Sequence, residues 1–169
     1  LAPELLGEAV QLGGERVFLC VVQRVQADRL DRGDLPHALA LELGKEYKAI
    51  TDSGILVQID DPFLPDIFVG PGLDEQQMKR RAQIYAEAVN NGLAGIPRDK
   101  VRFHTCYGIN EGPRIHEAGL ADVVDAMLAV NAGAYSFEAA NPRHEHEYHV
   151  WKTAKLPAGK KLIPGVITH

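Results

Sequence analysis

The sequence has little cysteine and no long hydrophobic run. Its two cysteines, Cys20 and Cys106, cannot form the disulfide framework of a small secreted domain, so a reducing cytoplasm is the expected location. The longest purely apolar run near the start covers residues 17–22, far too few to cross a bilayer. Residues 1–16 also lack the basic region and small-residue cleavage pattern of a signal peptide. We therefore expect a cytoplasmic protein with no membrane partner.

Charge of one sign is not concentrated in any part of the chain. The net charge is −5, and acidic and basic residues are interspersed, so neither a basic nucleic-acid site nor an acidic partner arm is expected. The sequence lacks repeats and low-complexity tracts. It also lacks phosphate-binding and dinucleotide-binding motifs and the Gly-x-Ser-x-Gly elbow of many hydrolases. With 46% hydrophobic residues in 169, the chain can still bury the core of one domain.

Short β-rich segments alternate with segments of helical periodicity. The pattern predicts strands at 17–22, 55–60, 101–106, 134–138 and 161–167, and helices at 35–51, 117–130 and, more weakly, 142–152. A further helix begins at Asp74, whose spacing from Gln77 is typical of a capping box, and Gly92, Gly95 and Pro97 end it. This alternation predicts an α/β fold with a parallel sheet.

Two α/β architectures fit the alternation: an open doubly wound sheet and a (β/α)8 barrel. A complete barrel usually needs about 250 residues. Five predicted strands in 169 residues would make a little over half of a barrel, whereas an open sheet could be complete at this length. Length alone therefore favours the open sheet.

The residue types that carry chemistry gather at one structural position. Asp60, His104, Cys106 and Glu138 all lie at the C-terminal end of a predicted strand, and His169 lies just past the last strand. In parallel α/β folds of either architecture, binding and catalytic sites are built at that edge of the sheet. We therefore expect these side chains to converge.

The segment His104-Thr105-Cys106 suggests a metal site. Residues i and i+2 of a strand point to the same side, so the imidazole and the thiolate would converge. Zinc takes nitrogen and sulfur ligands, and a catalytic zinc site uses three protein ligands, the third of which could be Glu138. The alternative is a buried cysteine that acts as a small hydrophobic residue beside a core histidine.

Two further polar groups have open interpretations. Asp60 and Asp61 cannot share a face of a strand, so Asp60 could bind a cationic group of a substrate while Asp61 braces the turn before Pro62. The alternative is a simple Asx-type turn at the end of the strand. The histidines at 144, 146 and 149 could hold a second metal, but a solvated helix start with mixed charges fits them better.

Several segments together resemble the catalytic domain of the cobalamin-independent methionine synthase family, in the order and at the separations found there. They are Gln58-Ile59-Asp60-Asp61-Pro62, His104-Thr105-Cys106-Tyr107-Gly108, Phe137-Glu138 and Pro164-Gly165-Val166. The similarity runs from about residue 34 to the end, and residues 1–33 have no counterpart. Residues 107–114 are closest to the shorter stand-alone members, including the coenzyme M transferases that open epoxides.

The resemblance implies that residues 1–169 form a single, partial (β/α)8 barrel domain, against the preference from length. It implies a zinc ion, held by His104, Cys106 and Glu138, that binds a substrate thiol as a thiolate. The partners would be a small thiol and a methyl donor, and a homo-oligomer is compatible with the family. Asp60 would bind the amino group of homocysteine, and His169 would take part in protonating the leaving group.

The chain departs from the family in two respects. The family uses a second cysteine far downstream as a zinc ligand, but no cysteine follows Cys106, and the last strands of a barrel are also missing. Either the remainder lies outside this chain, or this is a relative that no longer works alone. The alternative function is therefore a non-catalytic barrel fragment that serves as a structural or interaction subunit.

Overall fold

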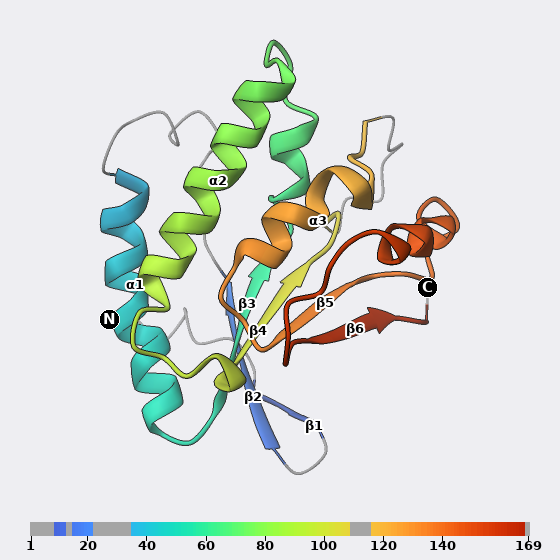
Figure 1. Cartoon of the computed structure of the whole chain (residues 1–169). Coiled ribbons are helices and arrows are strands. Elements are labelled where there is room, and N and C mark those ends of the chain that lie inside the picture. The colour runs from blue at the N-terminus through green and yellow to red at the C-terminus, as the bar shows by residue number, and fades with distance from the viewer. Residues whose placement is uncertain (1–8, 13–14, 22–34, 109–115, 168–169) are drawn as a thin grey trace.

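Strands and helices alternate along the part of the chain that the computed structural model describes, residues 9–12, 15–21, 35–108 and 116–167 (Figure 1). The elements are, in order, β1 (Ala9–Leu12), β2 (Glu15–Val21), α1 (Leu35–Asp52), β3 (Leu56–Asp61), η3 (Pro65–Phe68), α2 (Glu75–Gly92), η4 (Arg98–Lys100), β4 (Val101–Thr105), α3 (Leu120–Ala129), β5 (Ala134–Glu138), η5 (Glu145–Lys152) and β6 (Lys161–Gly165). The predicted α/β class with a parallel sheet is confirmed.

The order of the strands in the sheet is the order of the strands in the chain, β1 to β6. Each strand from β2 to β6 pairs in parallel with the next, and β1 pairs antiparallel with β2. A doubly wound sheet reverses its strand order at a switch point. The described strands show no such reversal, so double winding is not observed among them. Their sheet is open, with β1 and β6 at its edges, and a closed barrel is not observed.

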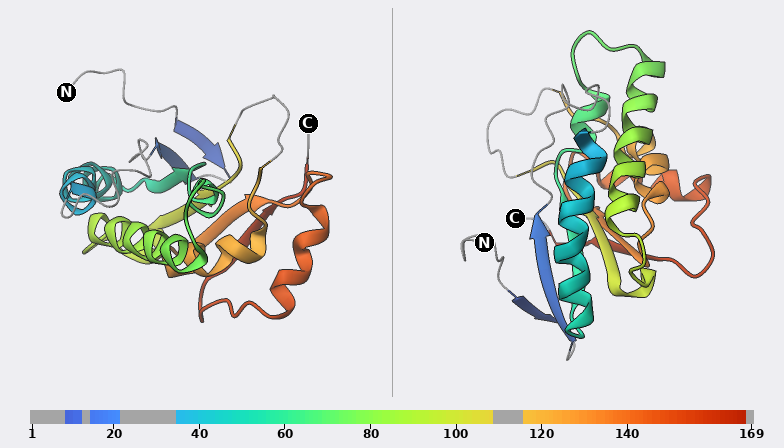
Figure 2. Two further views of the ribbon diagram at one scale, coloured as in Figure 1. Left: turned by 90° about the horizontal axis from the view of Figure 1, so that it is seen from above. Right: turned by 90° about the vertical axis from the view of Figure 1, so that its left-hand side faces the viewer.

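The helices α1, α2 and α3 lie on the same side of the sheet, as both views of Figure 2 show. Burial alternates along β4 and β5: Phe103 and Tyr135 are fully buried, while their neighbours His104 and Ser136 are half-buried. Strands covered on both faces are apolar throughout. Among the described residues, α1, α2 and α3 cover one face of the sheet (Figure 2), and the polar side chains of Arg102, His104 and Ser136 lie on the opposite face.

The helix that begins at Asp74 was predicted correctly. The Gln77 backbone N–H donates to Asp74 Oδ1 at 2.8 Å, and the Asp74 N–H donates to Gln77 Oε1 at 2.9 Å, which is the predicted capping box. At the other end of α2, a Cβ on Gly92 would lie 2.7 Å from the carbonyl oxygen of Ala40 in α1. The two backbones therefore touch directly, which only glycine permits at this position.

Several element boundaries differ from the prediction. The predicted helix 117–130 begins at Leu120 after an extended Gly119, and the predicted helix 142–152 is a 3₁₀ helix over Glu145–Lys152. The last strand ends at Gly165 rather than at residue 167. The antiparallel strand β1 was not predicted at all. Apart from the 3₁₀ helix, these differences fall at the ends of elements and in the N-terminal residues 1–33.

A membrane-spanning helix is not found among the described residues, since none of their helices combines sufficient length with sufficient apolar character.

Candidate functional site

Three polar side chains lie side by side on neighbouring strands, on the sheet face opposite α1, α2 and α3. The strand register aligns Asp60 of β3 with His104 of β4, and His104 with Ser136 of β5. His104 Nε2 is 3.6 Å from Asp60 Oδ1, and His104 Nδ1 is 3.2 Å from Ser136 Oγ. The imidazole is thus held at one nitrogen by a hydroxyl, while the other nitrogen faces a carboxylate.

The surroundings of His104 favour its neutral form. Burial lowers the pKa of the ring, and the Arg102 guanidinium lowers it further, whereas the carboxylates of Asp60 and Glu138 oppose these effects in part. Arg102 lies two residues before His104 on the same face of β4, and its Nε donates to Oε1 of Gln58 on β3. A neutral imidazole with one nitrogen fixed by a hydrogen bond is the form in which histidine binds metals.

Cys106 follows directly after β4 and has a partly buried side chain. Burial raises the pKa of its thiol, and the negative charges of Asp60, Glu138 and Asp61 raise it further, while the Gly108 N–H acts in the opposite direction. These effects favour the thiol over the thiolate. Such an environment does not suit a free nucleophile, and the thiolate would form there only beside an added positive charge such as a metal ion.

Glu138 ends β5 and comes close to Cys106. The two side chains line one small cavity with Thr105 and Tyr107. Asn141 Nδ2 donates to Glu138 Oε2 at 3.4 Å, which restrains the carboxylate. The predicted site residues therefore lie at one edge of the sheet in two pairs, Asp60 with His104 and Cys106 with Glu138. His169, the predicted proton donor, lies outside the described residues.

The donor types at this edge fit zinc, since they comprise one nitrogen, one sulfur and one carboxylate. Their positions fit less closely: within residues 9–12, 15–21, 35–108 and 116–167, no three His, Cys, Asp or Glu side chains are near enough to one another to hold a metal ion. The predicted convergence is thus partial. Binding of zinc would require the Cys106 and Glu138 side chains to move toward Nε2 of His104.

Asp61 performs the structural role that was predicted for it. Its Oδ1 accepts hydrogen bonds from the backbone N–H groups of Phe63 at 2.9 Å and Leu64 at 3.1 Å, so it closes β3 with an Asx-type turn. The carboxylate is buried, and burial raises its pKa to about 6, against the opposing effects of the neighbouring Tyr85 hydroxyl and of the two backbone donors. Asp60 and Asp61 point to opposite faces of the sheet, as expected.

His144, His146 and His149, which were considered as a possible second metal site, do not share one environment. His146 and His149 are exposed, but His144 is only 6% exposed, so the prediction of a solvated helix start is wrong at this residue. The His144 ring stacks on Tyr107 at 3.9 Å and 7° between the ring planes. Nε2 of His144 also lies near Oε2 of Glu117, which is 27 residues earlier in the sequence. No local sequence pattern could therefore indicate this contact.

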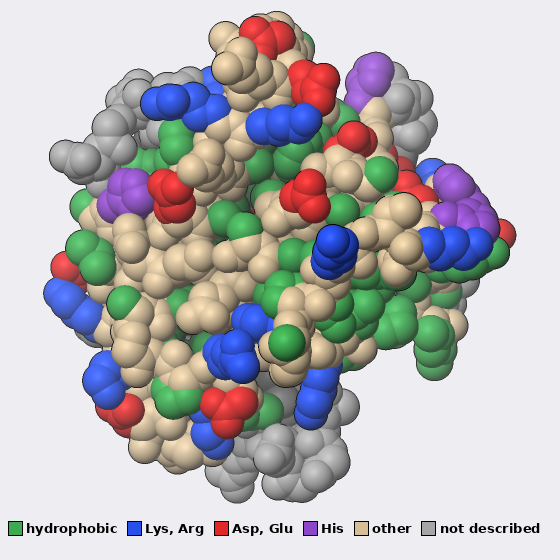
Figure 3. Space-filling view, in the orientation of Figure 1, with side chains coloured by type: hydrophobic (Ala, Val, Ile, Leu, Met, Phe, Trp, Pro, Cys, Tyr) green, Lys and Arg blue, Asp and Glu red, His purple; other side chains and the backbone are tan. Residues whose placement is uncertain are grey.

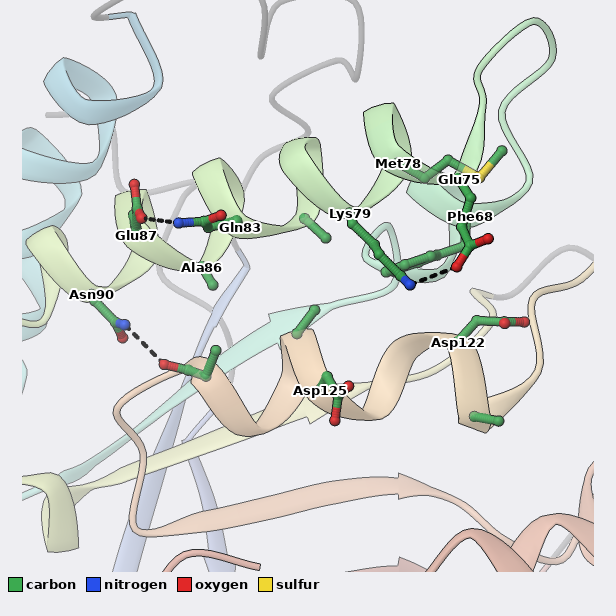
Figure 4. A pocket seen from close by; sticks show the side chains of 14 residues that line it. Phe68, Glu75, Met78, Lys79, Gln83, Ala86, Glu87, Asn90, Asp122 and Asp125 are labelled. Atoms are coloured by element: carbon green, nitrogen blue, oxygen red, sulfur yellow. Dashed lines mark hydrogen bonds and ion pairs between the residues drawn. The ribbon is translucent and has the colours of Figure 1, made fainter. Parts of the chain in front are cut away.

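A groove of about 630 Å³ lies between α2 and α3, on the outer side of the helices (Figure 4). Alanine side chains line much of it, and Asn90 Nδ2 donates across it to the Ala129 carbonyl oxygen at 2.9 Å. Acidic and basic side chains are interspersed on this side of the molecule, as Figure 3 shows. The groove is lined by neither histidine nor cysteine, so it cannot perform the chemistry predicted for the strand ends.

Comparison with models of known protein families gives no match, and comparison with curated protein sequences gives none either.

Proposed function

We propose that this chain carries the metal-binding edge of an enzyme that transfers a methyl or other alkyl group to a substrate thiol with the help of zinc. The observation that carries the proposal is the environment of His104. Ser136 holds Nδ1, and Nε2 is directed toward Asp60, at the edge where Cys106 follows β4 and Glu138 ends β5. The unreversed strand order supports a partial (β/α)8 barrel as the scaffold.

Each residue has a distinct task in this proposal. Nε2 of His104, the Cys106 thiolate and the Glu138 carboxylate would hold the ion, and Asn141 would restrain Glu138. When bound, zinc supplies the positive charge that lowers the pKa of a substrate thiol and keeps it as a nucleophilic thiolate. Asp60, whose side chain is 32% exposed, would bind a substrate ammonium group, as the amino group of homocysteine would provide.

The test is to measure zinc and thiol alkylation together. The full-length protein is expected to contain about one zinc per chain, and Cys106→Ser to lose it, because a hydroxyl is a poor ligand beside a thiolate. His146→Ala is the matched control, since this exposed histidine lies outside the site. Alkylation is assayed with a panel of small thiols and methyl donors. Zinc retained by Cys106→Ser but lost by His146→Ala would show that the metal lies elsewhere.

A second candidate, a non-catalytic structural or interaction subunit, is favoured by one observation. The described ligands do not meet around a common point. In that case the purified protein would bind zinc no more tightly than the Cys106→Ser variant does, and no thiol in the panel would be alkylated. The same experiment therefore separates the two candidates.

A further inference from the structure

A buried cluster of one histidine and two carboxylates lies next to Tyr107, the residue after Cys106, and the proposed function assigns it no task. Its centre is His144, the residue before η5. Nδ1 of His144 is 3.1 Å from Glu147 Oε2, and Nε2 is 3.2 Å from Glu117 Oε2. The side chains of Glu117 and Glu147 are only 12% and 14% exposed. Both ring nitrogens therefore lie within hydrogen-bond distance of a carboxylate oxygen.

The cluster connects three segments that are far apart in the sequence. Glu117 lies before α3 and also accepts from Arg143 Nε at 2.9 Å. Glu147 belongs to η5 and packs against the start of α3, where a Cβ on Gly119 would come within 3.2 Å of its Oε1. The flat face of the His144 ring stacks on Tyr107, which follows Cys106.

We propose that His144 is a positioning residue for Cys106. The bridge from Glu147 through His144 to Glu117 fixes the plane of the imidazole ring. The Tyr107 ring lies parallel to it at 3.9 Å, so Tyr107 is held in one orientation. Because Tyr107 is joined to Cys106 by one peptide bond, and Gly108 donates its N–H to Cys106, the position of the thiol depends on the same platform.

This geometry matters because the ligands of the proposed site are not yet gathered. Cys106 lines its small cavity together with Tyr107 and Glu138, so a shift of Tyr107 changes both the access to the thiol and its distance from Glu138. A hydrogen bond from the His144 ring to a carboxylate, with a second carboxylate beside the other ring nitrogen, makes His144 a stiffer support than stacking alone would.

The test measures Cys106 itself, in a Cys20→Ser background in which it is the one remaining thiol. In metal-free protein, the rate at which a thiol reagent modifies Cys106 reports its position. His144→Ala is expected to raise that rate on the order of tenfold, the effect of losing a charge-assisted hydrogen bond on a local equilibrium. Zinc affinity, measured by competition with a coloured chelator, is expected to fall by about 10- to 100-fold.

Three further variants separate positioning from general packing. His144→Phe keeps the stack but cannot bind the carboxylates, so its values are expected between those of wild type and His144→Ala. Glu147→Gln removes one charge and serves if His144→Ala does not fold. His146→Ala, an exposed histidine two residues away, is expected to match wild type in both measurements.

The proposal is wrong if His144→Ala lowers the melting temperature but leaves Cys106 reactivity and zinc affinity unchanged, or if His144→Phe matches wild type. The inference rests on the proposed function for its zinc measurement only. If wild type binds no zinc, the proposed function fails, yet the reactivity of Cys106 in metal-free protein still decides whether His144 positions it.

Discussion

The two faces of the sheet are built from the same strands but do different work. On the face covered by α1, α2 and α3, side chains such as Val57, Ile59 and Phe103 are fully buried in the core. On the opposite face, Asp60, His104 and Ser136 are half-buried and contact one another across three strands. Consecutive residues of a strand point to opposite faces. One face therefore supplies apolar side chains to the core, and the other presents the polar side chains of the candidate site.

The largest expected effect belongs to the covered face. Phe103→Ala removes a fully buried aromatic ring and is expected to lower the free energy of unfolding by about 3–5 kcal/mol. The measurement is urea unfolding followed by circular dichroism. Ala134→Gly, on the face of β5 opposite the helices, is the control. Its free energy of unfolding is expected to fall by about 1 kcal/mol or less. Equal losses at the two positions would contradict the division between the faces.

Asp61 is the exception on the covered face, because it is a carboxylate among apolar side chains. Burial raises its pKa in the folded state from 3.8 to about 6. The folded state therefore binds a proton more strongly than the unfolded state, and stability falls as the pH rises from about 4 to about 6. Above pH 6 the loss corresponds to about 3 kcal/mol.

Asp61→Asn is expected to remove this dependence, because the amide keeps an oxygen for the N–H groups of Phe63 and Leu64 but cannot ionise. Unfolding between pH 3.5 and 8 should give a flatter profile for the variant and a higher stability above pH 6. Tyr85→Phe, which removes the hydroxyl that lowers the pKa of Asp61, should move the decline to higher pH. If the stability of Asp61→Asn depended on pH in the same way as that of wild type, Asp61 would not be the cause of the pH dependence.

The sequence could predict what depends on local periodicity. The capping box at Asp74, the strands around Phe103 and Tyr135, and the opposite directions of Asp60 and Asp61 follow from spacings of one to four residues. The α/β class follows from the alternation of elements. The choice between a doubly wound sheet and a singly wound one could not follow from length, because it depends on which strands pair.

The candidate site was predictable in position but not in detail. Strand ends place His104, Cys106 and Glu138 at one edge, yet the side-chain distances depend on rotamers that no spacing fixes. Ser136 and the contact between Tyr107 and His144 were missed because each joins segments about 30 residues apart or more. Zinc, the thiol substrate and the cytoplasmic location stay predictions.

The smallest expected effect on stability is that of a substitution on the face opposite the helices. It tests most directly whether that face contributes to the candidate site more than to stability. Ser136→Ala removes the hydroxyl at 3.2 Å from His104 Nδ1, and this half-buried group should contribute only about 1 kcal/mol to the free energy of unfolding. Its effect on the proposed site should be larger in proportion, because the hydrogen bond at Nδ1 orients the ring whose Nε2 would bind the metal. Zinc affinity is expected to fall by about tenfold. Ser136→Thr restores the hydroxyl and should recover most of the affinity. If Ser136→Ala and Ser136→Thr bind zinc equally well, the ring of His104 is oriented by its packing alone.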